Sequence, residues 1–114
     1  MEVHRLSQVG GIDVNFRVVT GSTVATQTDY IIACNHGLLL GITVTLPNAN
    51  LRSGQLIIIK RWGSGDTAAI TVNSGGGTLQ SRTGTTVTSY NLPLTFEQYG
   101  CWFSDGTNWK YLGD

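Results

Sequence analysis

The chain has few charged residues and no excess of either sign. Of its 114 residues, 12% are charged, with seven acidic and seven basic side chains. A typical globular protein has about 25% charged residues. The absence of net positive charge argues against binding to nucleic acid through its phosphates. The combination of zero net charge with 40% hydrophobic residues argues against intrinsic disorder.

Long hydrophobic runs, prolines and cysteines are also scarce. No apolar run approaches the roughly 20 residues of a membrane span, and no apolar core of a signal peptide follows residues 1–5. We therefore expect no membrane insertion. The only two cysteines, Cys34 and Cys101, do not make a disulfide framework. Both lie in apolar, strand-like segments, so we expect buried thiols.

Glycine and threonine are abundant, and helical periodicity is almost lacking. Apolar residues instead alternate with threonine in short segments bounded by turn residues. The clearest segment is 42–46, in which Ile42, Val44 and Leu46 are expected to face a core. About seven or eight such segments follow one another at regular spacing. This pattern predicts an all-β protein, an antiparallel β-sandwich of jelly-roll-like topology.

Three further segments refine the predicted fold. Residues 55–60 contain four consecutive apolar residues, which predicts a strand covered on both faces. Asp-Gly at 105–106 predicts a hairpin turn before the last strand. Before residue 20 the alternating pattern is weak, although residues 14–19 are compatible with a strand. We therefore predict an N-terminal arm or shaft-like segment over residues 1–25 and a β-sandwich head domain over residues 26–114.

No set of residues predicts a metal site or a cofactor site. Cys34 and His36 lie two residues apart, but a structural zinc site needs four ligands, and the chain has only two cysteines and two histidines. Three copies of His4 or His36 on the axis of a trimer would be an alternative way to bind a metal. The glycine-rich segments lack the Lys-Ser/Thr sequence and the helix of a phosphate-binding loop. We expect neither metal nor cofactor.

Catalytic motifs are not evident either. The serines do not occur in a Gly-X-Ser-X-Gly sequence. Glu97 and Asp105 could serve glycoside hydrolysis only if their carboxyl groups lay roughly 5–9 Å apart across a cleft. Asp105 is better explained by the Asp-Gly turn, and Glu97 by an outward position on a strand. We therefore predict that the protein is not an enzyme.

Aromatic residues are the best candidates for ligand binding. Aromatic rings stack on the C–H faces of sugars, although they also pack across strands and in cores. Trp62 follows an apolar strand and adjoins Lys60 and Arg61, which could hold an acidic sugar or stack on the indole ring. Trp109 is expected to be structural because it closes the final hairpin. The predicted ligand-binding residues are Lys60, Arg61, Trp62 and Trp102.

Five segments in a fixed order carry a resemblance to a known family. They are Tyr-Ile-Ile at 30–32, Ile-Thr-Val-Thr-Leu-Pro at 42–47, Gly-Gln-Leu-Ile-Ile-Ile-Lys at 54–60, Ile-Thr-Val at 70–72 and Ser-Asp-Gly-Thr-Asn-Trp at 104–109. In this order they resemble the C-terminal β-rich head module of bacteriophage tail fibres, tailspikes and related virion proteins. Residues 101–103 are bulkier and more aromatic than in that family, and residues 1–25 are not covered.

The resemblance implies a small β-sandwich, usually a homotrimer on a fibre, that serves adhesion or assembly. Apolar residues at 38–40 and 56–59 favour self-association independently, because they exceed what a 12 kDa sandwich can bury. We therefore predict a non-enzymatic virion domain, the homotrimeric tip of a tail fibre or spike, that binds a host cell-surface glycan or protein. Two alternatives are a structural trimerisation cap without receptor contact and a free, extracellular, lectin-like carbohydrate-binding module.

Overall fold

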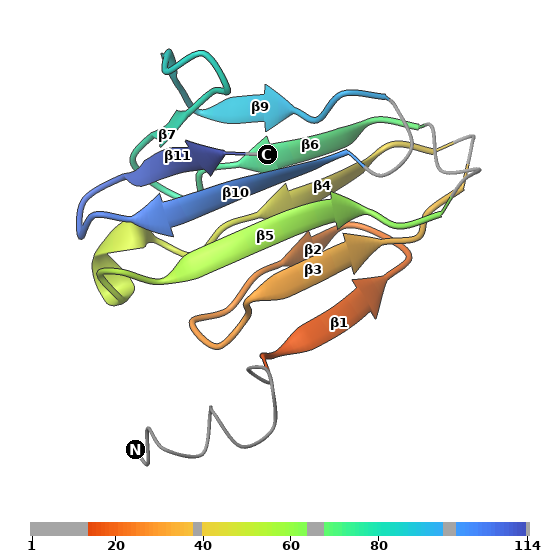
Figure 1. The fold of residues 1–114 in the computed structure, drawn as a ribbon, viewed down its shortest axis with the longest axis horizontal. Helices are drawn as coiled ribbons and strands as arrows, with labels where there is room; N and C mark the ends of the chain where they lie inside the picture. Colours follow the sequence, from red (N-terminus) through yellow and green to blue (C-terminus); the bar gives the residue numbers. More distant parts are fainter. Residues whose placement is uncertain (1–13, 38–39, 64–67, 95–97, 114) are drawn as a thin grey trace.

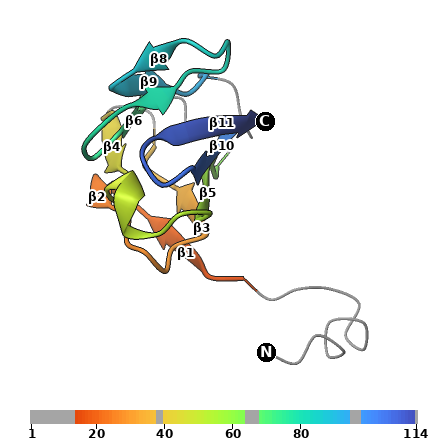
Figure 2. The ribbon, with the colours of Figure 1, turned by 90° about the vertical axis from the view of Figure 1, so that its left-hand side faces the viewer.

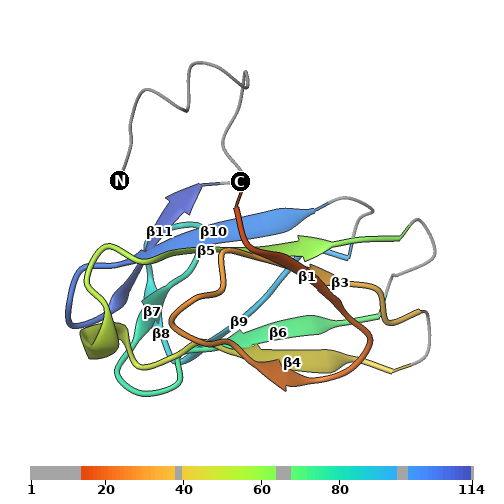
Figure 3. The same cartoon turned by 90° about the horizontal axis from the view of Figure 1, so that it is seen from below.

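The chain folds into two β-sheets that pack face to face (Figures 1 and 3). The computed structural model describes residues 14–37, 40–63, 68–94 and 98–113. Its eleven strands confirm the predicted all-β sandwich. They outnumber the seven or eight predicted strands because four of them have only two or three residues, too few for an alternating pattern to be visible.

The two sheets differ in size. The large sheet has seven strands in the order β1 (Phe16–Val19), β3 (Ile31–Cys34), β5 (Leu56–Arg61), β10 (Tyr99–Ser104), β11 (Trp109–Gly113), β7 (Leu79–Gln80) and β8 (Thr86–Val87). The small sheet has four strands in the order β2 (Thr23–Val24), β4 (Ile42–Thr45), β6 (Ile70–Asn73) and β9 (Ser89–Asn91). A single helical turn, η1 (Ala49–Leu51), precedes β5.

The first six strands alternate between the two sheets and pair in parallel. β1, β3 and β5 lie side by side in the large sheet, and β2, β4 and β6 in the small sheet. The N-terminal half of the sandwich is thus wound as three successive coils of two strands each. Antiparallel pairing joins β10 to β5 and β11, β9 to β6, and β8 to β7. The predicted antiparallel, jelly-roll-like topology is therefore wrong for the first half of the chain, and in the second half β11 pairs with β7 in parallel as well.

The first coil also corrects the predicted domain boundary. β1 pairs with β3 and β2 pairs with β4, so residues 16–24 belong to the sandwich and not to an arm. In Figure 2, β1 and β2 lie at one end of the two sheets and β8 and β9 at the other. The sequence pattern is weak in this coil because edge strands keep alternate residues exposed, among them Phe16 and Val18. Residues 1–13 lie outside the described residues.

The core lies between the sheets, and a large part of it consists of residues stacked at equivalent positions of successive coils. Ile42 pairs with Ile70 and Val44 with Val72 in the small sheet. Ile42, Val44 and Leu46 are all buried, which confirms the predicted register of this segment. β5 alternates instead of being covered on both faces: Ile57 and Ile59 are buried, whereas Leu56 and Ile58 are half-buried. The prediction for residues 55–60 is correct about the strand, whereas within one chain its outer face is only half-covered.

The C-terminal hairpin is as predicted. β10 and β11 are joined by a turn in which the Asp105 carboxylate accepts hydrogen bonds from the amides of Thr107 (2.9 Å) and Asn108 (2.8 Å). These bonds lower the pKa of Asp105. Cys34 and Cys101 are buried thiols, as expected, and they lie on opposite faces of the large sheet. Burial raises the pKa of Cys101, which keeps this thiol protonated.

Candidate functional site

Trp102 is a core residue and not a ligand-binding residue. Its side chain is fully buried, and its indole Nε1 donates a hydrogen bond to the carbonyl oxygen of Gln80 at 2.8 Å. Its ring meets the rings of Tyr90 and Tyr111 edge to face, with centroids 5.9 and 5.4 Å apart. The ring thus fills the core between β9, β10 and β11. The prediction for Trp102 is wrong because a buried ring cannot reach a ligand.

Arg61 is also buried, so its predicted role in ligand binding is wrong as well. Its guanidinium donates from Nη1 to the carbonyl oxygen of Ala68 at 2.6 Å and from Nη2 to that of Pro93 at 3.0 Å. Nε donates to the same Pro93 oxygen at 3.2 Å. Arg61 therefore links the segment after β5 to the segment after β9. The guanidinium is planar and holds its N–H donors in a fixed arrangement that reaches both carbonyl oxygens at once. A lysine ammonium is a single point of charge and lacks this arrangement.

We expect Arg61→Lys to destabilise the fold by about 3 kcal/mol, because a single ammonium group cannot reproduce the three hydrogen bonds that the buried guanidinium donates to Ala68 and Pro93. Chemical denaturation followed by tryptophan fluorescence measures this loss. The opposite exchange on the outer face of the same strand, Lys60→Arg, is the matched control and should change the free energy of unfolding by less than about 0.5 kcal/mol. Equal losses in the two variants would contradict the structural role of Arg61.

Trp62 and Lys60 lie on the outer face of the large sheet. Trp62 is 44% exposed, and its ring centroid lies 5.6 Å from that of Phe16. Lys60 is half-buried and pairs with Tyr99 of β10. Arg61 points to the opposite face, because successive side chains of a strand alternate. The three neighbouring residues do not form one site, and a ligand-binding role for Trp62 and Lys60 stays a prediction.

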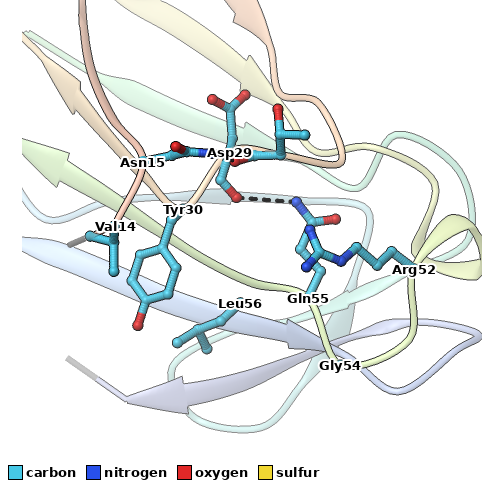
Figure 4. A pocket seen from close by; sticks show the side chains of 9 residues that line it. Val14, Asn15, Asp29, Tyr30, Arg52, Gly54, Gln55 and Leu56 are labelled. Atoms are coloured by element: carbon cyan, nitrogen blue, oxygen red, sulfur yellow. Dashed lines mark hydrogen bonds between the residues drawn. The ribbon is translucent and has the colours of Figure 1, made fainter. Parts of the chain in front are cut away.

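A separate pocket of about 350 Å³ lies where β1, β3 and β5 begin. Figure 4 shows Val14, Tyr30 and Leu56 along one side of it and Asn15, Asp29, Gln55 and Arg52 along the other. Thr28 and Gly54 complete the lining. Parallel pairing brings these segments together: the amide of Ile31 donates to the carbonyl oxygen of Asn15 at 3.0 Å, and that of Ile58 donates to Tyr30 at 2.7 Å.

Hydrogen bonds hold the polar side of this pocket in place. Gln55 is only 5% exposed, and its Nε2 donates to the carbonyl oxygens of Thr26 at 2.9 Å and Asp29 at 3.2 Å. The exposed Arg52 donates from Nη1 to the carbonyl oxygen of Gln27 at 2.6 Å. The segment before β5 is thereby fixed to the segment before β3. The pocket is preformed by these contacts.

The carboxylate of Asp29 is already neutralised by an arginine from β1. Arg17 donates to Asp29 from Nε at 2.9 Å and from Nη2 at 3.0 Å, and the amide of Thr26 adds a bond of 2.8 Å. Burial alone would raise the pKa of Asp29, but these bonds together outweigh it and the pKa lies below its usual value. The carboxylate is therefore ionised, and it is satisfied by groups of its own fold.

Several polar atoms of the pocket have no hydrogen-bond partner among the described residues. They are Nε and Nη2 of Arg52, Oε1 of Gln55 and the hydroxyl of Tyr30. Arg52 also has no ion pair within these ranges. The pocket thus combines unused donors and acceptors with the apolar side chains of Val14 and Leu56.

Sequence reasoning missed this pocket. Tyr30 and residues 54–56 drew attention only as parts of the family resemblance, Val14 and Asn15 only as parts of a possible strand, and none was proposed as a ligand-binding residue. The spacing of Asn15, Tyr30 and Leu56 gives no signal by itself. Only the parallel pairing of β1, β3 and β5 makes these residues neighbours.

The residues weighed for metal binding and hydrolysis do not assemble in the described ranges. His4 and Glu97 lie outside the described residues. His36 is half-buried, with Nε2 3.0 Å from the carbonyl oxygen of Ala68. Where the structure describes the chain, no three His, Cys, Asp or Glu side chains come together, and no helix is long and apolar enough to cross a membrane. No protein-family model matches the chain, and no curated protein sequence matches it significantly.

Proposed function

We propose that the chain is a non-enzymatic attachment domain, the homotrimeric tip of a bacteriophage tail fibre or spike that binds a host-surface glycan or protein. The observation that carries this proposal is the apolar outer face of the large sheet. Side chains that point away from the core include Phe16, Val18, Tyr99 and Leu112, which are 51%, 43%, 38% and 59% exposed. Between them lie the half-buried Ile31, Ile58 and Phe103.

The outer face of the small sheet is mostly polar by contrast. One row is Thr43, Thr71 and Asn91, and the other is Val24, Thr45, Asn73 and Ser89, so the one apolar side chain in these rows is Val24 on the edge strand β2, which is 65% exposed. The hydroxyl of Thr71 donates to Oδ1 of Asn91 at 2.8 Å, so this face satisfies part of its own hydrogen bonding. A sandwich that stays monomeric is expected to have polar residues on both outer faces. The difference favours the large sheet over the small sheet as the proposed interface.

A second copy of the chain fits this face best. The exposed apolar side chains named above present surface on the order of a few hundred Å², the size of the largest apolar patch on a typical soluble protein, which is often a functional surface. The chain has no net charge, so copies of it do not repel one another as they approach. The number three and the location on a virion come from the family resemblance of residues 30–111. Of the apolar run 38–40, residues 38 and 39 lie outside the described residues, and Leu40 is exposed.

The pocket at the start of β1, β3 and β5 favours attachment over a purely structural cap. Its unused donors and acceptors serve no purpose in holding the fold together. A trimerisation cap requires only the apolar face, whereas an attachment domain also requires a recognition surface. A lectin-like module would have the pocket without any need for the apolar face.

The oligomeric state tests this proposal. We expect light scattering after size exclusion to give about three times the 12.3 kDa of one chain. Val18→Lys, on the outer face of β1, should yield a folded monomer, because each interface would then contain buried charges. Thr43→Lys, on the polar face of the small sheet, is the control and should leave the trimer intact. A monomeric wild-type protein would rule out the trimeric tip.

A further inference from the structure

We propose that the pocket formed by Tyr30, Arg52 and Gln55 binds one acidic sugar unit, a hexuronate, through its carboxylate. This inference rests on the proposed function, because it names the class of surface glycan to which the domain attaches. It concerns a site distinct from the aromatic pair Phe16 and Trp62 on the outer face.

The size and rigidity of the pocket suit a single sugar ring. Its volume of about 350 Å³ is near the lower end of the range typical for small-molecule sites, roughly 300–1,000 Å³. It lies at the start of three paired strands, and the nearly buried Gln55 is held by two carbonyl groups. Binding to such a preformed site avoids much of the ordering cost of a flexible loop.

The charge of the pocket selects an anion. Two acidic or basic side chains line it, Asp29 and Arg52, and Asp29 is paired with Arg17. The positive charge of Arg52 is therefore not balanced by another side chain in the described ranges. Nη1 of Arg52 donates to the carbonyl oxygen of Gln27. The N–H groups of Nε and Nη2, which lie on one edge of the guanidinium, remain available to a ligand. This edge presents two parallel N–H groups, the geometry that binds a carboxylate with two hydrogen bonds.

The remaining groups select a sugar over a simple carboxylate. Oε1 of Gln55 can accept a hydrogen bond from a ring hydroxyl, and the hydroxyl of Tyr30 can accept or donate one. The ring of Tyr30 lies beside Val14 and Leu56 (Figure 4), so the pocket also offers an apolar surface to the C–H groups of a sugar. A neutral sugar has no carboxylate to pair with Arg52. Acetate has no hydroxyl groups to form hydrogen bonds with Gln55 and Tyr30.

Titration calorimetry on the whole chain, with glucuronate, galacturonate, glucose and acetate as probes, tests this inference. We expect at least one of the two uronates to bind at least tenfold more tightly than glucose and acetate. A carboxylate can also come from an acidic side chain of a protein, so a short Asp/Glu-containing peptide is a further probe. Tighter binding of this peptide than of either uronate would overturn the assignment to a sugar, as would equal binding of glucose.

Two variants and a control connect the binding to this pocket. Arg52→Ala should lower uronate affinity at least tenfold, and Tyr30→Phe should lower it a few-fold while keeping the ring. Arg82→Ala removes an exposed arginine in the turn between β7 and β8 and should have no effect. Circular dichroism verifies that each variant is folded, and if Arg52→Ala is not, Tyr30→Phe decides the question alone. Unchanged affinity in the folded pocket variants would overturn the inference.

The same proteins separate this inference from the proposed function. If the wild-type trimer binds bacterial surfaces and Arg52→Ala binds them equally well, attachment stands and the pocket is not its site. If the wild type is monomeric and binds no bacterial surface or surface polysaccharide, the proposed function fails. In that case, uronate binding that depends on Arg52 would leave a lectin-like module as the function.

Discussion

Gly75→Ala is expected to cost at least about 4 kcal/mol of folding free energy, a loss reached only by severe packing or backbone defects. A Cβ atom at this position would lie 1.7 Å from the carbonyl oxygen of Leu46, which is far inside van der Waals contact. The obstacle is backbone, so no side chain can rotate away. Gly75 also has a φ of +69°, where an L side chain is strained. Total stability for a chain of this length is roughly 6–17 kcal/mol.

Gly84→Ala provides the matched control. Gly84 has a φ of +89°, but no atom lies within 4 Å of the position its Cβ would take. Gly84→Ala should therefore lower the free energy of unfolding only through the strained backbone conformation, by about 1 kcal/mol. Urea denaturation of both variants separates the two contributions. If Gly75→Ala lost no more stability than Gly84→Ala, the close approach of the turn to Leu46 would be incorrect.

The glycine-rich turn 75–77 illustrates what a sequence can and cannot reveal. Three successive glycines are typical of a turn after a strand, and β6 ends at Asn73. The reason for glycine lies elsewhere in the chain, because the turn packs against residues 46–48 and 107–108. Nε1 of Trp109 donates to the carbonyl oxygen of Pro47 at 2.9 Å and so joins the same segments. Such long-range contacts leave no local signal in the sequence.

The faces of the strands were predictable, whereas their directions were not. Alternation of apolar and polar residues places Ile42, Val44 and Leu46 in the core whether the neighbouring strand runs parallel or antiparallel. Short connections between strands suggested hairpins, but β1 to β6 cross from one sheet to the other at each step. The arrangement of the pocket depends on that crossing, which is why its residues could not be found from spacing.

The two incorrect site residues have different causes. Arg61 continues the inward positions of Ile57 and Ile59 along β5, so strict alternation would have predicted that it points into the core. Its charge made an exposed position the natural expectation, since buried arginines are rare. The burial of Trp102 depends on Tyr90 and Tyr111, which come from two other strands. For Trp102 no local pattern distinguishes a core ring from an exposed one.

Leu46→Asp is expected to abolish folding at neutral pH. Leu46 is 1% exposed, and it belongs to the buried cluster between the sheets. An ionised carboxylate there would have no partner, and its burial costs several kcal/mol in addition to the lost packing of the leucine. Together these losses are comparable with the whole stability of a chain of this size. The loss of cooperative unfolding, followed by near-ultraviolet circular dichroism, measures the effect.

Two further variants separate burial from position. Leu46→Met keeps the volume and polarity and should cost less than about 1.5 kcal/mol. Thr45→Asp places the same charge on the neighbouring residue, which is half-buried and points away from the core, so the protein should fold. Burial would raise the pKa of the new carboxyl of Leu46→Asp, so its deficit relative to the wild type should shrink as the pH falls from neutral towards about 4, the usual pKa of an unfolded aspartate, and should stay constant below that pH. A stable, cooperatively folded Leu46→Asp at neutral pH would mean that this segment is one residue out of register, which would reverse the two faces of β4.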